Sequence, residues 1–200
     1  MTQVTEAADI TLAFDTSGQY CAAALLRGGD LLGAVCEPMK RGQSERLMSL
    51  MEELLAEHGL NWQDLTRIGV GVGPGNFTGI RIAVSAARGL ALSLGVPAIG
   101  VSTFEATLRG KPAGSTALVA APREQLYVQT HGEDVRLDDA ANWQGVAEAY
   151  MPPAPEQLAE SIAYVAASAP ANAPAPTPLY IKPADAAPAS DPPPVILDDA

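Results

Sequence analysis

Seven residues near the middle of the chain have the types and spacing of a loop that could bind an anion: Gly73-Pro74-Gly75-Asn76-Phe77-Thr78-Gly79. They follow a short apolar run, Ile68–Val72, which is typical of a strand buried on both faces. They precede a helical segment, Gly79–Leu94, which we expect Thr78 to cap. Backbone amides at the start of a helix attract phosphate and other anions. Many strand-to-helix turns need glycine and bind nothing, so a purely structural role stays open.

The spacing excludes two better-known phosphate loops. A Walker loop has a lysine directly after its last glycine, but the residue after Gly79 is an isoleucine. A dinucleotide-binding fingerprint that began at Gly71 or Gly73 would need a further glycine where the chain has Asn76 or Thr78. An anion at this loop would therefore be bound in some other way.

The loop and its surroundings resemble the TsaB (YeaZ) family. The usual sequence of this loop in the family is Gly-Pro-Gly-Ser-Phe-Thr-Gly, so Asn76 is a small departure. The resemblance runs from Leu12 to Thr103 and thins out further on, to Arg123–Tyr127 and Leu179–Ala186. It implies an α/β fold of the actin/Hsp70/sugar-kinase (ribonuclease H-like) type. It also implies a role in making threonylcarbamoyladenosine (t6A) on tRNA, as the non-catalytic scaffold or activator of the related subunit TsaD.

Asp15 is the second candidate for chemistry, because it ends the predicted first strand, Ile10–Asp15. Kinases of the fold implied by the resemblance keep an acidic residue there, near magnesium and phosphate. Aspartate at a strand end also bonds its own backbone in ordinary turns. Without a second carboxylate at a recognisable spacing, a Mg-ATP site is hard to complete. A small ATP-dependent phosphotransferase remains the alternative function, and an inactive protease-like homologue is another.

The sequence predicts neither a metal nor a cofactor. The catalytic relative TsaD holds a metal with two histidines on its first helix, whereas the corresponding helix here, Ser44–His58, has no histidine before its end. Ala120 stands where the family commonly has an aspartate. Two cysteines and two histidines are too few and too scattered for a protein-only zinc site. We therefore expect a pseudoenzyme.

The two predicted helices have wider apolar arcs than one sheet requires, which is about 100°. Small residues on the second helix also let another helix approach closely. Excess apolar surface often marks an interface, although residues 103–168 could cover it instead. We predict docking of a TsaD-type subunit, within a complex that can include a TsaE-type ATPase, or of a second copy in its absence. The predicted interface residues are Met48, Met51, Leu55, Ile80, Ala83, Val84, Ala87 and Ala91.

Charge and hydropathy argue against two other classes of partner. The net charge is −11, and no cluster of Lys and Arg exceeds the pair Lys40-Arg41, so the chain lacks the cationic surface for tight, direct binding of nucleic acid. No stretch of 18 apolar residues and no signal-peptide pattern is present, which favours a cytoplasmic protein without a membrane span.

The order of predicted elements, β-β-β-α-β-α-β over residues 1–102, is that of half an actin-like unit, with one mixed sheet and helices packed on it. Gly28-Gly29 predicts a two-residue hairpin in which Cys21 faces Cys36. Residues 103–190 are predicted to form a reduced C-terminal lobe, with helices at 103–108 and 156–168 and strands at 116–121 and 126–130. An Ala/Pro-rich loop, 169–178, and a loose tail, 191–200, complete the chain.

Overall fold

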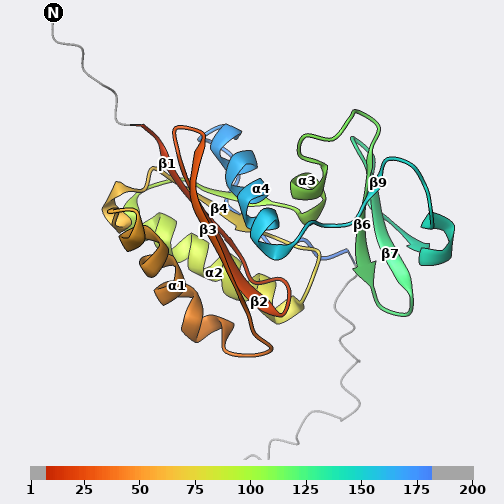
Figure 1. Cartoon of the computed structure of the whole chain (residues 1–200), viewed down its shortest axis with the longest axis horizontal. Coiled ribbons are helices and arrows are strands. Elements are labelled where there is room, and N and C mark those ends of the chain that lie inside the picture. Colours follow the sequence, from red (N-terminus) through yellow and green to blue (C-terminus); the bar gives the residue numbers. More distant parts are fainter. Residues whose placement is uncertain (1–7, 182–200) are drawn as a thin grey trace, which may run out of the picture.

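A computed structural model describes residues 8–181 of the chain. The first layer of its fold is a five-stranded mixed sheet (Figure 1). Its strand order is β3-β2-β1-β4-β5. Strand β1 runs antiparallel to β2 and parallel to β4, and β4 runs parallel to β5. The predicted actin-like fold class is therefore confirmed. The strands are β1 Ile10–Asp15, β2 Tyr20–Arg27, β3 Asp30–Pro38, β4 Arg67–Gly71 and β5 Ala98–Val101.

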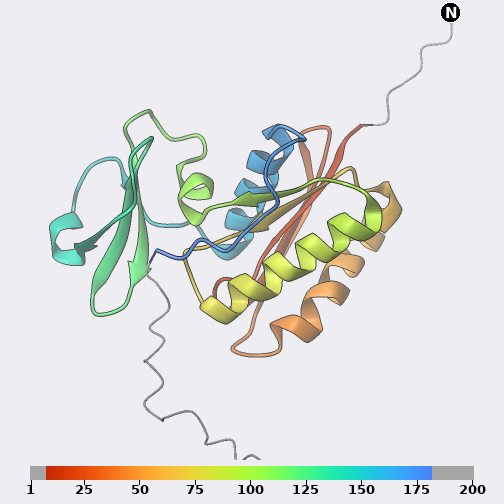
Figure 2. The ribbon, with the colours of Figure 1, turned by 180° about the vertical axis from the view of Figure 1, so that it is seen from behind.

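Helices cover both faces of this sheet, as Figures 1 and 2 show. Helices α1 (Gln43–Glu57) and α2 (Phe77–Leu94) lie on one face and share a single apolar cluster with it. Helix α4 (Pro155–Ser168) packs on the other face against β1, β2 and β4. The prediction placed this helix in the C-terminal lobe, so the sequence division at residue 102 does not follow the spatial layers. Alanines on the inner face of α4 permit the close approach.

A second, four-stranded sheet has the order β8-β7-β6-β9. It contains β6 (Thr116–Ala121), β7 (Gln125–Thr130), β8 (Arg136–Asp139) and β9 (Ala149–Tyr150), and α3 (Thr103–Leu108) packs on β6. The predicted strands at 116–121 and 126–130 and helices at 103–108 and 156–168 are confirmed. The prediction missed β8 and β9, because a four-residue strand with three charged residues and a strand of two residues give no periodic signal. Two short 3-10 turns complete the elements, Trp62–Asp64 and Ala140–Trp143.

The β2–β3 hairpin has the predicted turn but a different register. Next to the turn, Arg27 pairs with Asp30, as a two-residue loop requires. A bulge between Leu25 and Leu26 then shifts the pairing by one residue, so that Cys21 lies opposite Glu37 rather than Cys36. The predicted Cys21–Cys36 pair is therefore wrong, because a bulge places one extra residue on one strand. Burial raises the pKa of the Cys21 thiol to about 11.

Both helices begin one or two residues earlier than predicted, and the residue that caps α2 is Asn76 rather than Thr78. Helix α1 begins after Gly42, whose φ is 93°, and Ser44 lies inside its first turn. Helix α2 begins after Asn76, whose side-chain oxygen accepts a hydrogen bond from the Gly79 amide at 2.8 Å. Asparagine and serine cap helices about equally well, so Asn76 in place of the family's usual serine is a conservative change.

The Ala/Pro-rich segment that follows α4 is extended, as predicted, and returns along the first sheet toward the second (Figure 2). Arg67 holds its beginning by donating to the carbonyl oxygen of Ala169 at 2.6 Å. The Leu179 amide, near its end, donates to the Val72 carbonyl oxygen at 2.8 Å. The predicted loose tail, 191–200, lies outside the described residues.

Within residues 8–181, α2 is the one helix long and apolar enough to cross a membrane by length and composition. In this fold it packs on β4, with Ile80, Ala83, Val84 and Ala87 buried. One such helix is weak evidence for a membrane span, because core helices of globular proteins pass the same test.

Candidate functional site

The glycine loop is a tight joint between the end of β1 and the start of α2. A Cβ atom at Gly79 would lie 1.8 Å from the Thr16 carbonyl oxygen, and one at Gly75 would lie 2.6 Å from the Ser17 carbonyl oxygen. The Thr16 hydroxyl donates to the Gly79 carbonyl oxygen at 2.7 Å. Glycine is therefore needed here because two backbone segments touch.

Several polar groups of the loop already have protein partners. The Asn76 amide donates to the Ser17 carbonyl oxygen at 2.6 Å, and the Thr103 amide donates to the Gly73 carbonyl oxygen at 2.8 Å. The Gly79 amide is satisfied by the Asn76 side chain, and Thr103 Oγ1 donates to the Pro74 carbonyl oxygen at 3.2 Å. Two amides of the loop, those of Asn76 and Gly79, thus already have acceptors within the protein, which supports a structural role of the loop.

Asp15 lies beneath this joint with 1% of its surface exposed. Its Oδ2 atom accepts hydrogen bonds from Ser17 Oγ at 2.8 Å and from Tyr20 Oη at 2.6 Å. Burial raises the pKa of the Asp15 carboxyl, although the hydrogen bonds from Tyr20 and Ser17 act in the opposite direction. Burial and the nearby carboxyl also raise the pKa of Tyr20. This arrangement fixes the end of β1 and leaves Asp15 turned into the protein.

We expect the isolated chain to release no phosphate from Mg-ATP above the buffer background. The reason is that Asp15, the carboxylate at the place where kinases of this fold hold magnesium, is buried and bonded to Ser17 and Tyr20. A coupled phosphate-release assay measures this directly. Steady release that Asp15→Ala abolishes would contradict the prediction and favour the phosphotransferase alternative.

Six of the eight predicted interface residues belong to the core. They have at most 4% of their surface exposed, and they are Met51, Leu55, Ile80, Ala83, Val84 and Ala87. The prediction of a docking surface is wrong for these six, because the sheet and the contact between α1 and α2 together use the wide apolar arcs. Met48, at 41% exposure, and Ala91, which is half-buried, reach the surface.

A groove between α1 and α2 remains open on the outer side of these helices. Its volume is about 490 Å³, and Met48 and Phe77, each 41% exposed, give it apolar walls. Grooves of this size with apolar walls and a few polar groups are typical binding sites. The lining residues are Ser44, Leu47, Met48, Phe77, Thr78, Arg81, Ile82, Ser85 and Ala86.

Sequence reasoning missed the cluster at one end of this groove. The guanidinium of Arg81 lies over the ring of Phe77, 3.8 Å from Cζ to the ring centroid. Arg81 Nε also donates a hydrogen bond to Tyr180 Oη at 2.8 Å. The two partners are almost one hundred positions apart in the sequence, and only the return of the C-terminal segment brings them together. The thin family resemblance at Leu179–Ala186 was the one sequence signal that pointed to this segment.

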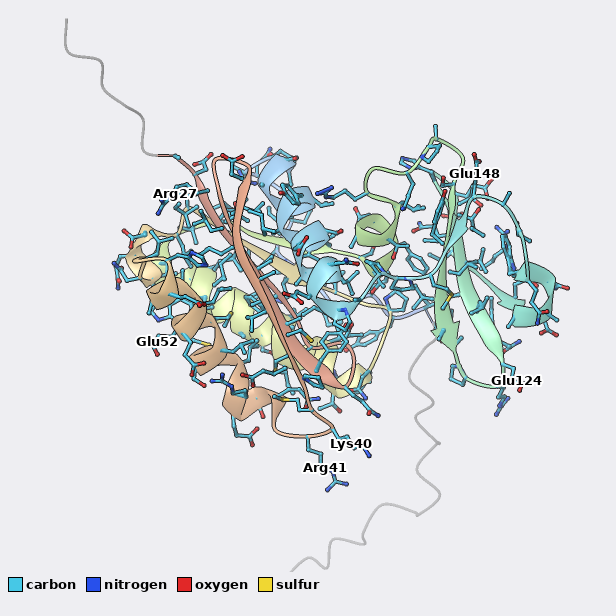
Figure 3. All side chains as sticks on the ribbon, in the orientation of Figure 1. Arg27, Lys40, Arg41, Glu52, Glu124 and Glu148 are labelled. Carbon is cyan, nitrogen blue, oxygen red and sulfur yellow. The ribbon has the colours of Figure 1, made fainter. Side chains whose placement is uncertain are left out.

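The outer side of α1 is acidic. Arg46 bridges Glu37 of β3 and Glu53 of α1, at 2.6 and 2.5 Å, and its hydrogen bonds lower the pKa of both carboxyls. These pairs are largely solvated, so they add little stability. Glu52 points away from the sheet in Figure 3. A partner that lies across both helices therefore meets carboxylates beside α1 and arginines along α2.

The two histidines lie far from any catalytic arrangement. His58 caps the end of α1 and would crowd a Cβ at Gly33, while His131 is exposed after β7. In the part of the chain that the structure describes, no group of three or more His, Cys, Asp or Glu side chains is placed to hold a metal ion. A protease-like triad would combine Ser17 and Asp15 with a histidine, but the third residue that bonds to Asp15 is Tyr20.

Comparisons with known proteins agree with this fold. A family model described as TsaD, tRNA N6-adenosine threonylcarbamoyltransferase, matches residues 30–180. A solved structure described as YeaZ from Pseudomonas aeruginosa is 31% identical, with a TM-score of 0.53, and the match covers 72% of this chain and 68% of that one. The chain belongs to the TsaB/YeaZ family.

Curated TsaB proteins support the same membership. The protein from Escherichia coli, named tRNA threonylcarbamoyladenosine biosynthesis protein TsaB, is 32% identical over 67% of this chain and 58% of its own length. The TsaB of Haemophilus influenzae is 36% identical over 64% of this chain and 56% of its own length. The chain thus spans less than three fifths of the length of these two TsaB proteins.

Proposed function

We propose that this chain is a non-catalytic scaffold or activator subunit in the biosynthesis of t6A on tRNA and that it docks a TsaD-type subunit through the α1–α2 groove. Its TsaB relatives are named for this pathway. The observation that carries the docking part is the groove itself, with the exposed Met48 and Phe77 on its two sides. Methionine, aromatic residues and arginine are enriched at protein interfaces.

The non-catalytic part of the proposal rests on the finding that the candidate polar groups already have hydrogen-bond partners within the protein. Asp15 is buried and bonded to Ser17 and Tyr20, and the amides of Asn76 and Gly79 have protein partners. In the same proposal, a second copy occupies the groove when the TsaD-type subunit is absent. A TsaE-type ATPase also joins this complex. This chain itself makes no tight contact with tRNA, and the complex acts in the cytoplasm.

Met48→Glu tests the docking surface. An unpaired charge buried in an interface costs about 3 kcal/mol or more, so affinity for the TsaD-type subunit of the same organism should fall about 100-fold. Isothermal titration calorimetry gives the affinity, and circular dichroism shows whether the chain stays folded. Since Met48 is 41% exposed in the free chain, the variant should melt like the unmodified protein.

Val146→Glu is the matched control, because Val146 is 43% exposed and lies outside the groove, before β9. It introduces the same charge at a site of similar exposure. The affinity should stay within about twofold of that of the unmodified chain, because surface substitutions usually have small effects. If Met48→Glu stays folded and binds as tightly as Val146→Glu, the partner docks elsewhere and this part of the proposal fails.

A further inference from the structure

Two aromatic residues hold a single arginine at one end of the α1–α2 groove. The Arg81 Cζ atom lies 3.8 Å from the centroid of the Phe77 ring and 5.8 Å from that of Tyr180. The ring centroids of Phe77 and Tyr180 are 5.2 Å apart. Since Phe77 and Tyr180 are each more than 40% exposed as residues, this cluster stands at the surface rather than in the core.

Arg81 still has unused donors. Of the five N–H groups of a guanidinium, the Nε–H is taken by Tyr180 Oη. Within residues 8–181, no ion pair or hydrogen bond to the two terminal nitrogens of Arg81 is found. Arg81 is also the one charged side chain among those that line the groove, whose neighbouring walls include Met48, Ile82 and Ala86.

These contacts determine which ligand group the site suits. A planar guanidinium matches the two oxygens of a carboxylate and binds them through two parallel hydrogen bonds. An apolar surface that covered Arg81 would leave its charge buried without a counter-charge, which is strongly unfavourable. The complementary surface is therefore apolar opposite Met48 and Ile82 and acidic opposite Arg81. Because Phe77 and Tyr180 already restrict the arginine, little side-chain entropy remains to be lost on binding.

We propose that Arg81 determines the specificity of the docking groove by receiving an Asp or Glu carboxylate, flanked by apolar residues, from the TsaD-type subunit. The inference rests on the proposed function, because it names the chemistry by which the same groove selects its partner. Tyr180 is a positioning residue, since it aims the guanidinium without touching the partner's carboxylate. The C-terminal segment thereby becomes part of the docking surface.

Isothermal titration of the full chain with the TsaD-type subunit of the same organism, at low and high salt, tests this inference. Arg81→Gln should weaken binding about 30-fold and reduce the salt dependence, as expected for a central arginine that meets a carboxylate. Arg81→Lys should restore the salt dependence but recover the affinity only in part, because it keeps the charge without the planar fork. Tyr180→Phe, which loses one hydrogen bond, should weaken binding about two- to tenfold.

Arg88→Gln is the matched control, because Arg88 is an exposed arginine on the same helix that does not line this groove. It should bind within about twofold of the unmodified chain, as an exposed rim charge does. If Arg88→Gln weakens binding as much as Arg81→Gln, the attraction is general and the assignment of Arg81 is overturned. Circular dichroism should give the same melting curve for all four variants, because both arginines and Tyr180 are exposed.

The failure of this inference can be told from that of the proposed function. If Met48→Glu abolishes binding while Arg81→Gln binds normally, the groove is the docking site and Arg81 is not its specificity residue. If neither change weakens binding, the docking surface itself is misplaced. If Arg81→Gln changes only self-association, measured by light scattering, the carboxylate comes from a second copy and the TsaD-type subunit is not the occupant.

Discussion

Replacing Gly79 by alanine should destabilise the fold by about 2 kcal/mol or more, because the new Cβ has no room. It would lie 1.8 Å from the carbonyl oxygen of Thr16. A backbone oxygen cannot rotate away as a side chain can, and the Thr16 hydroxyl ties the same segment to Gly79. The end of β1 and the start of α2 would have to separate. Urea denaturation followed by circular dichroism measures the loss.

Gly89→Ala is the control in the same helix. Apart from the surrounding turns of its own helix, nothing lies within 4 Å of a Cβ at Gly89. This change should therefore stabilise the chain by about 0.5–1 kcal/mol, the usual gain of alanine over glycine in a helix. Equal stability of Gly79→Ala and Gly89→Ala would contradict the close contact between β1 and α2. It would also remove the argument that the glycine loop is a structural joint.

Val84→Glu should prevent folding. Val84 is 4% exposed and belongs to the apolar cluster between the sheet and its two helices. A carboxylate left unpaired there costs about 3–5 kcal/mol, which is a large part of the stability of an ordinary domain. We expect a chain without a cooperative melting transition, measured by circular dichroism and light scattering.

Ser85→Glu, at the neighbouring position, is exposed and should fold normally. These two substitutions, at adjacent positions, therefore distinguish the buried side of α2 from its exposed side. A Val84→Glu chain that melts like the unmodified protein would show that Val84 faces solvent, as the sequence prediction had it, and that the burial described for α2 is wrong.

The sequence predicted the first sheet and its helices well, because buried β-branched runs and helical periodicity carry the signal locally. It could not predict which part of a wide apolar arc stays exposed. Met51 and Leu55 are buried, whereas Met48 is exposed on the same helix, since α1 meets both the sheet and α2. Periodicity measures the width of an arc and does not identify the surfaces that share it.

The errors at the candidate site have the same origin in tertiary structure. A bulge between Leu25 and Leu26 moves Cys36 away from Cys21, and no local pattern announces it. The Arg81–Tyr180 contact closes a loop of almost one hundred residues, so it has no short-range signal either. Asp15 could be placed at a strand end from sequence, but its burial under Ser17 and Tyr20 depends on the fold.

The most direct test of the central proposal is to quantify t6A in tRNA by mass spectrometry after reaction with this chain alone, with the TsaD-type subunit alone and with both together, all with the same remaining components and substrates. We predict t6A only, or far more of it, when both are present, none from this chain alone, and a loss of the stimulation with Met48→Glu. Formation of t6A by this chain alone, or equal yields with and without it, would contradict the proposal.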